Sequence, residues 1–168
     1  MLDNRNHGHA ASAPPDTVQK QPGQLPVRLI VLDSQGLFRT SLARLLAGEG
    51  SFEIAGECAT ADEARAILAA APVDIVLLAS EIGLPQTAGL LAAARDSGLP
   101  TRFLIVSATA DAARASALLG LGVAGIFLKS GPAATLIEAL TRIASGGVWV
   151  DPRIVRQIAE ESPRPNAP

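Results

Sequence analysis

The chain has 168 residues, of which 48% are hydrophobic and 18% charged, and its formal net charge is -2. This size suits one domain with some tail, and the charge excludes the basic excess typical of nucleic-acid binders. One cysteine, Cys58, excludes an internal disulfide and makes a cysteine-based zinc site unexpected. No apolar run reaches the ~18 residues that span a membrane, and the N-terminus has no signal-peptide core. We therefore expect a cytoplasmic protein that binds neither a membrane nor nucleic acid directly.

Residues 1–26 are polar, rich in proline and glycine, and without a period, which predicts a disordered arm. From Val27 onward short apolar runs alternate with helical patterns. The predicted strands are 27–32, 52–58, 74–78, 102–108 and 124–129, and the predicted helices with their caps are 36–47, 60–71, 90–95, 111–121 and 130–145.

Five β-α units in succession, four of them with unalternating apolar strands, predict a parallel sheet that is buried on both faces. Right-handed crossovers would then give an α/β fold with a doubly wound five-stranded parallel sheet, over residues 27–147. Residues 148–168 are predicted to be a C-terminal extension. It would contain a short helix over 153–161, capped by Asp151 with Pro152 at its first position, and a frayed tail.

In doubly wound folds, ligands and chemistry lie at the carboxyl ends of the strands. The residues that follow or end the predicted strands are therefore the candidate functional ones. They are Asp33 and Ser34, Ala79 to Glu81, Ser107, and Lys129 with Ser130.

Four stretches of the chain resemble response-regulator receiver domains, especially those of the LuxR/NarL type. The first strand and helix of these domains resemble LIVLDSQGLFRTSLARLL, and their third strand with its active-site loop resembles VDIVLLASEIGLP. Their fourth strand resembles FLIVSA, and their fifth strand, its lysine and the last helix resemble GVAGIFLKSGPAATLIEALTRIASGGVWVDP. The resemblance covers about residues 27–152 and implies a (βα)5 flavodoxin-like receiver fold.

The resemblance also implies a phosphorylation site, of which this sequence keeps only a part. Asp33 fits the first residue of the family's acidic pair, whereas Ser34 stands where the direct Mg²⁺ ligand is expected. Ser107 fits the switch hydroxyl, and Lys129 fits the lysine that pairs with the phosphoryl charge. The phosphoacceptor aspartate falls on Ala79, which cannot carry a phosphoryl group.

A second alignment places Glu81 at the acceptor position, because the two extra residues between Asp74 and Gly89 can precede or follow the acceptor. A glutamate there could reach toward Lys129 and imitate a phosphorylated aspartate. We favour Ala79, because the apolar strand continues directly into it. Neither alignment provides an acceptor aspartate.

We expect the degenerate site to work without a metal or cofactor, because Asp33 and Lys129 can neutralise each other. For partner binding, the candidates are the face of the fourth helix and fifth strand, and the region after the last receiver helix. The candidate residues are Leu118, Leu119, Ile126 and Trp149.

The function that this pattern favours is a stand-alone pseudo-receiver, without a DNA-binding output domain, that signals by binding proteins and is not an enzyme. Its partner would be a kinase, another regulator or a signalling protein, or a second copy in a homodimer. One alternative is a conventional receiver phosphorylated on Glu81 or Ser80. Another is a small enzyme on a flavodoxin-like fold, although the predicted folded part offers no clustered nucleophile and base.

Overall fold

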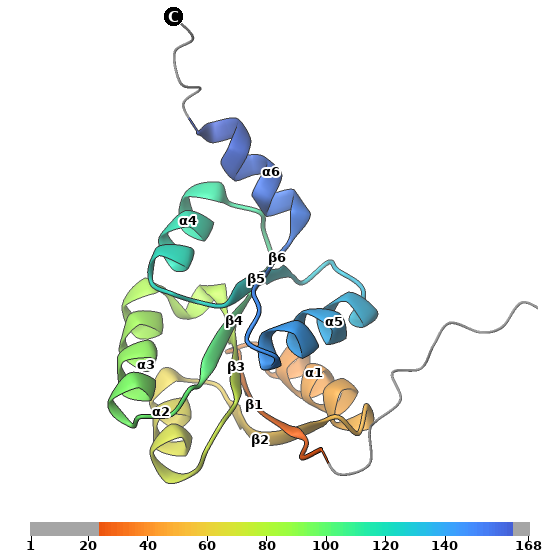
Figure 1. Ribbon diagram of the computed structural model, residues 1–168, viewed down its shortest axis with the longest axis vertical. Coiled ribbons are helices and arrows are strands. Elements are labelled where there is room, and N and C mark those ends of the chain that lie inside the picture. Colours follow the sequence, from red (N-terminus) through yellow and green to blue (C-terminus); the bar gives the residue numbers. More distant parts are fainter. Residues whose placement is uncertain (1–23, 163–168) are drawn as a thin grey trace, which may run out of the picture.

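The structure, a computed structural model, describes residues 24–162, which form a single parallel sheet covered by helices on both faces (Figure 1). The strand order is β2-β1-β3-β4-β5-β6. The strands are β1 (Val27–Leu32), β2 (Phe52–Cys58), β3 (Ile75–Ala79), β4 (Arg102–Ser107), β5 (Gly125–Leu128) and β6 (Trp149–Val150). Residues 163–168 of the predicted frayed tail, and all but the last three residues of the predicted N-terminal arm, lie outside the described residues.

Six α-helices connect or follow these strands, and a 3-10 turn (Ser80–Ile82) follows β3. They are α1 (Gly36–Gly48), α2 (Ala61–Ala70), α3 (Leu84–Asp96), α4 (Ala112–Gly120), α5 (Ala133–Ala144) and α6 (Pro152–Glu161). Within the described range, no helix has the length and the apolar character needed to cross a membrane.

The predicted helix starts at α2 and α4 are confirmed by their capping bonds. The hydroxyl of Thr60 accepts from the Glu63 amide, and the carboxylate of Asp111 accepts from the Arg114 amide. Helix α3 begins six residues before the predicted start at residue 90. Glycine and proline at residues 83 and 85 predict a loop there, but proline also suits the first helical turn, where its missing N–H costs no bond.

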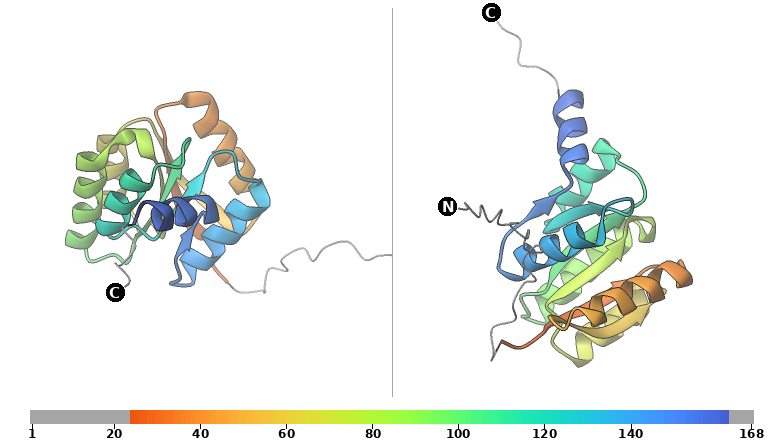
Figure 2. Two further views of the ribbon diagram at one scale, coloured as in Figure 1. Left: turned by 90° about the horizontal axis from the view of Figure 1, so that it is seen from above. Right: turned by 90° about the vertical axis from the view of Figure 1, so that its right-hand side faces the viewer.

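Alternate residues of each central strand point to opposite faces of the sheet and pack into two separate hydrophobic cores. In β4, Phe103 and Ile105 belong to one core, whereas Leu104 and Val106 belong to the other. Helices α2, α3, α4 and α6 cover the first core, and α1 and α5 cover the second, as the view from above in Figure 2 shows. The predicted doubly wound parallel arrangement is therefore confirmed.

The prediction of exactly five strands is wrong, because β6 adds a sixth at the edge of the sheet. Trp149 pairs with Gly125, and Val150 pairs with Ile126, both in parallel. Gly125 permits this close approach, since a Cβ there would lie 2.1 Å from the Trp149 carbonyl oxygen. Within the predicted C-terminal extension, Trp149 and Val150 therefore join the sheet, and Ile154 of the following helix is buried in the core.

Cys58, the last residue of β2, is buried in the first core. Burial raises the pKa of its thiol to about 11, because the thiolate would lose its hydration. The side chain therefore stays protonated at neutral pH and packs as a small apolar group.

Asp151 caps α6 and carries a pH-dependent share of the stability. Its buried carboxylate accepts from the Arg153 amide at 2.9 Å and pairs with the Arg153 guanidinium at 2.9 Å. The hydrogen bond from the Arg153 side chain lowers the pKa of Asp151 below its ordinary value. The carboxylate therefore stabilises the fold above about pH 4, the pKa of an unfolded aspartate, and this contribution disappears as the pH falls through the lower folded pKa.

Asp151→Asn is expected to lower the free energy of unfolding by about 1 kcal/mol at neutral pH, because asparagine keeps a cap acceptor but loses the negative charge that pairs with Arg153 and favours the helix N-terminus. The difference from the wild type should shrink as the pH is lowered toward about 3, because the wild-type carboxylate then begins to protonate. Urea unfolding at several pH values measures this, with Asp62→Asn at an exposed carboxylate as control. A difference that stays constant across the pH range would contradict the assignment.

Candidate functional site

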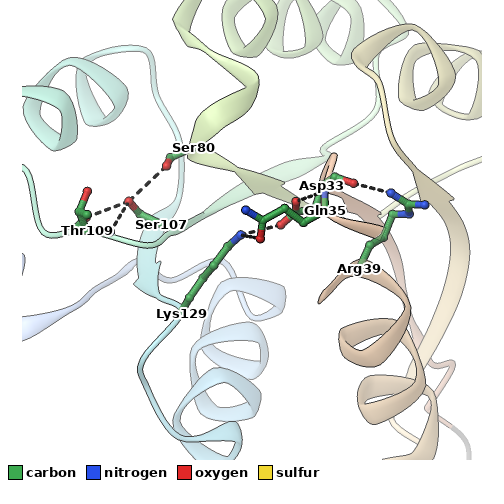
Figure 3. Close-up of polar contacts among 7 residues, drawn as sticks. All are labelled: Asp33, Gln35, Arg39, Ser80, Ser107, Thr109 and Lys129. Carbon is green, nitrogen blue, oxygen red and sulfur yellow. Dashed lines mark hydrogen bonds and ion pairs between the residues drawn. The ribbon is translucent and has the colours of Figure 1, made fainter. Parts of the chain in front are cut away.

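Four residues from four strands meet at the carboxyl edge of the sheet and form what we call the strand-end site. Asp33 follows β1, Ala79 ends β3, Ser107 ends β4, and Lys129 follows β5. Figure 3 shows Asp33, Ser107 and Lys129 at this edge. They meet because parallel strands all end at the same edge. Locally, the sequence has to supply only a short apolar run for each strand and a polar residue at or after its end.

Lys129 and Asp33 form a buried ion pair across the site. The Lys129 Nζ lies 2.8 Å from Asp33 Oδ2, with side chains that are 13% and 4% exposed respectively. Asp33 Oδ1 accepts from the Gln35 amide at 2.8 Å, so both carboxylate oxygens have a donor. Gln35 Oε1 also accepts from Lys129 at 3.4 Å, and the ammonium lies 4.3 Å from the centroid of the Phe38 ring. The lysine charge is thus satisfied by groups of the chain itself.

Arg39 fixes the loop that carries Asp33. From the first turns of α1, its guanidinium donates to the backbone carbonyl of Asp33 at 2.6 Å. Gln35, Phe38 and Arg39 are not among the site residues predicted from the sequence. The signal was available, since all three lie in the stretch DSQGLFR that carries the family resemblance.

A second cluster joins the ends of β3 and β4 through hydroxyl groups. Ser80 Oγ donates to Ser107 Oγ at 3.2 Å, and Ser107 Oγ donates to the Thr109 carbonyl at 2.8 Å. The Arg114 guanidinium, on α4, donates to the Ser80 carbonyl. Figure 3 shows the Ser107 hydroxyl directed toward Ser80 and Thr109, whereas Lys129 points toward Asp33 and Gln35. The switch hydroxyl and the lysine therefore belong to separate networks.

The structure places Ala79 and Glu81 in different surroundings. Ala79 is buried as the last residue of β3, directly after Leu78, and Leu78 pairs with the residue before Asp33. Glu81 is exposed in the 3-10 turn. In the part of the chain that the structure describes, the polar and ring contacts of the Lys129 ammonium are with Asp33, Gln35 and Phe38, and none is with Glu81.

The residues at this edge do not fit the Mg²⁺ that the family implies. Magnesium prefers several carboxylate oxygens, and among residues 24–162 no group of three acidic, histidine or cysteine side chains gathers anywhere. Asp33 contributes the carboxylate of the site, and a lysine and a backbone amide bind its two oxygens. Ser34, at the position of the direct metal ligand, is exposed.

The predicted partner-binding residues do not form a surface. Leu118 and Ile126 are 3% and 1% exposed, so this prediction is wrong for both of them. Leu119 and Trp149 are half-buried, and the Trp149 ring packs on Phe127 with centroids 5.7 Å apart. The apolar period that suggested a docking face is the period of a helix buried against the sheet and α6.

A parallel sheet with an acid, a hydroxyl and a lysine at its strand ends is the architecture of a receiver domain. Comparisons with known proteins agree, although no protein-family model matches the chain. The chain is 32% identical over 142 residues to the probable transcriptional regulatory protein NarL of Mycobacterium tuberculosis, covering 84% of this chain and 66% of that protein. It is 27% identical over 147 residues to the transcriptional regulatory protein DegU of Brevibacillus brevis, covering 86% of this chain and 61% of DegU.

The solved signal receiver domain of NarL from Mycobacterium tuberculosis superposes with a TM-score of 0.65 and 32% identity, over 72% of this chain and 98% of that domain. The chain therefore belongs to the receiver-domain family of response regulators in two-component signalling, of the LuxR/NarL type. It spans 61% and 66% of the length of the curated relatives DegU and NarL.

Proposed function

We propose that this receiver is a pseudo-receiver: it signals through protein contacts, without phosphorylation and without enzymatic activity of its own. The observation that carries the proposal is the state of the strand-end site. A buried alanine, Ala79, stands at the end of β3, and both oxygens of Asp33 are bound by Lys129 and the Gln35 amide. The site is therefore closed by its own side chains.

Phosphoryl transfer to a receiver needs a carboxylate in line with the phosphorus and a cation to spread the developing charge. The methyl group of Ala79 cannot act as the nucleophile. Lys129 is neutralised by Asp33, and the Ser107 hydroxyl is bonded to Ser80 and Thr109. The groups that would contact a phosphoryl group in a working receiver here contact one another.

The alternative acceptors lack the surroundings that would activate them. Glu81 is exposed, and the buried hydroxyl of Ser80 donates to another hydroxyl rather than to a base. A hydrolytic or transfer enzyme would also need a base beside Ser80 or Ser107. Both histidines of the chain, His7 and His9, lie outside the described residues.

A protein partner is the ligand that fits a closed polar site with exposed apolar residues at its rim. Leu37, the second residue of α1, is 85% exposed, and Leu84, the first residue of α3, is 37% exposed, so both lie at the carboxyl edge of the sheet. The partner class that we propose is a kinase, another regulator or a second copy of the chain.

A Mg²⁺ titration followed by NMR tests the proposal on the full chain. At millimolar Mg²⁺ concentrations, we expect no saturable chemical-shift changes of the amides next to Asp33, Ala79 and Lys129. A receiver with the complete acidic set serves as the positive control. The double variant Ser34→Asp with Ala79→Asp restores two carboxylates and should gain saturable shifts. Saturable binding of Mg²⁺ to the wild-type site would overturn the proposal.

A further inference from the structure

A groove lies at the amino edge of the sheet, opposite the strand-end site, and we call it the amino-edge groove. It has a volume of about 620 Å³, which is within the range of sites that bind small molecules. Its walls come from the starts of β1 and β4, from the segments that precede β3 and β4, and from the end of α5. Three of the lining residues are prolines, Pro26, Pro72 and Pro100, whose fixed φ angles make this part of the wall rigid.

Arg102, the first residue of β4, brings a positive charge into this groove. Its Nη2 donates to the Gly147 carbonyl at 2.8 Å, but in the part of the chain that the structure describes it takes part in no ion pair. Glu53 Oε1 lies 3.4 Å from Arg28 Nε, and Asp74 Oδ2 accepts from the Arg28 amide at 2.7 Å. Both acids of the groove are therefore engaged by Arg28, and the guanidinium of Arg102 can bind a further carboxylate.

The amino-edge groove opens where the N-terminal arm joins the domain. Leu25 lines the groove and is 88% exposed, and residues 1–23, which lie outside the described part, connect to it through Gln24. A stretch of eight residues spans up to about 26 Å, enough to turn back along the groove. A segment tethered this closely has an effective concentration in the millimolar range, so even a weak contact is populated. An occupant from the same chain is therefore favoured over a separate molecule.

One segment of the arm has the chemistry that the groove requires. Residues 14–18 read PPDTV, and the two prolines restrict the backbone before binding, which lowers the entropy cost of ordering it. In an extended chain, residues two apart lie on the same face, so Asp16 and Val18 can point into the groove together. Asp3, the other acid of the arm, is followed two residues later by Arg5, which would bring a like charge to the guanidinium.

We propose that the amino-edge groove binds residues 14–18 of the same chain, with the Asp16 carboxylate on the Arg102 guanidinium and Val18 against the proline-lined wall. The arm is then held at the edge of the sheet opposite the strand-end site, which stays accessible to a partner. The inference goes beyond the proposed function, because it concerns a second site and does not depend on how the first one works.

Paramagnetic relaxation enhancement on the full chain tests the proposal, with a nitroxide label attached to the variant Ala13→Cys. The label reacts at this position alone, because Cys58 is 1% exposed and burial raises the pKa of its thiol to about 11. We expect the label to broaden the amides of the groove segments that lie far from the arm in sequence. These segments are residues 72–74, 100–102 and 144–146.

The amides of residues 48–51 are the reference for an arm without a preferred site. They lie equally close to the start of β1, where the Val27 amide donates to the Ser51 carbonyl, but they do not line the groove. Equal broadening of residues 48–51 and of the groove segments would overturn the proposal. Broadening in a mixture of labelled chains with unlabelled, ¹⁵N-enriched chains would also overturn it, because the occupant would then be a second copy.

Substitutions on the two sides of the ion pair identify the contact. Asp16→Asn and Arg102→Gln should each lower the relaxation rates of the groove amides about two- to fivefold, as the loss of one partly exposed ion pair does. The double variant should lower them no further than either single one, because both remove the same interaction. Asp3→Asn is the matched control, with the same change of charge in the same arm, and should leave the rates unchanged. Equal effects of Asp16→Asn and Asp3→Asn would contradict the assigned pair.

Discussion

Lys129→Met is expected to lower the free energy of unfolding by about 3 kcal/mol, the order found when one partner of a buried ion pair is removed. The substitution keeps most of the side-chain volume but leaves the Asp33 carboxylate, 4% exposed, without its counter-charge. Of the two donors to this carboxylate, only the Gln35 backbone amide would then remain. Urea unfolding at neutral pH, followed by circular dichroism, measures the change.

The double variant Asp33→Asn with Lys129→Met is the internal control, since it removes both charges and should recover much of the lost stability. Arg65→Met breaks the exposed pair of Arg65 with Asp62 and should cost less than about 1 kcal/mol. If Lys129→Met costs no more than Arg65→Met, the ion pair does not hold the strand-end site together.

Gly125→Ala is expected to cost about 2–3 kcal/mol, the upper range for overpacking an interior position. Its Cβ would lie 2.1 Å from the carbonyl oxygen of Trp149 and 3.2 Å from Leu104 Cδ1. The first of these contacts is with backbone, so β6 must move away from β5. Trp149 is the single tryptophan of the chain, so its fluorescence reports the displacement directly.

Gly120→Ala is the matched control, because a Cβ at this last residue of α4 meets nothing within 4 Å. It should be neutral or stabilise the fold by up to about 1 kcal/mol, since alanine favours helix more than glycine does. Equal stabilities and tryptophan spectra for Gly125→Ala and Gly120→Ala would contradict the assigned packing of β6.

The parts of the fold that local pattern determines could be predicted from the sequence. The continuous apolar runs of β1, β3 and β4 indicated strands that are buried on both faces, and the caps at Thr60 and Asp111 located two helix starts. The pairing of Asp33 with Lys129 was also predicted, because parallel strands bring their ends together whatever the intervening sequence.

The parts that depend on tertiary contact could not be predicted. A strand of two residues such as β6 has no detectable period, and its place follows from the pairing with β5 and from the glycine at residue 125. The burial of Leu118 and Ile126 follows in part from α6, whose docking the local sequence does not indicate. Long side chains add a further difficulty, since Arg114 reaches the Ser80 carbonyl from another element.

The central claim, that this receiver works without phosphorylation, is tested most directly by intact-mass analysis after treatment of the full chain with acetyl phosphate and Mg²⁺. A conventional receiver with an acceptor aspartate, treated in parallel, shows that the donor is active. We predict that the mass of this chain does not change. A stoichiometric, hydroxylamine-labile adduct would contradict the claim, because it would show that a carboxylate such as Glu81 still accepts the phosphoryl group.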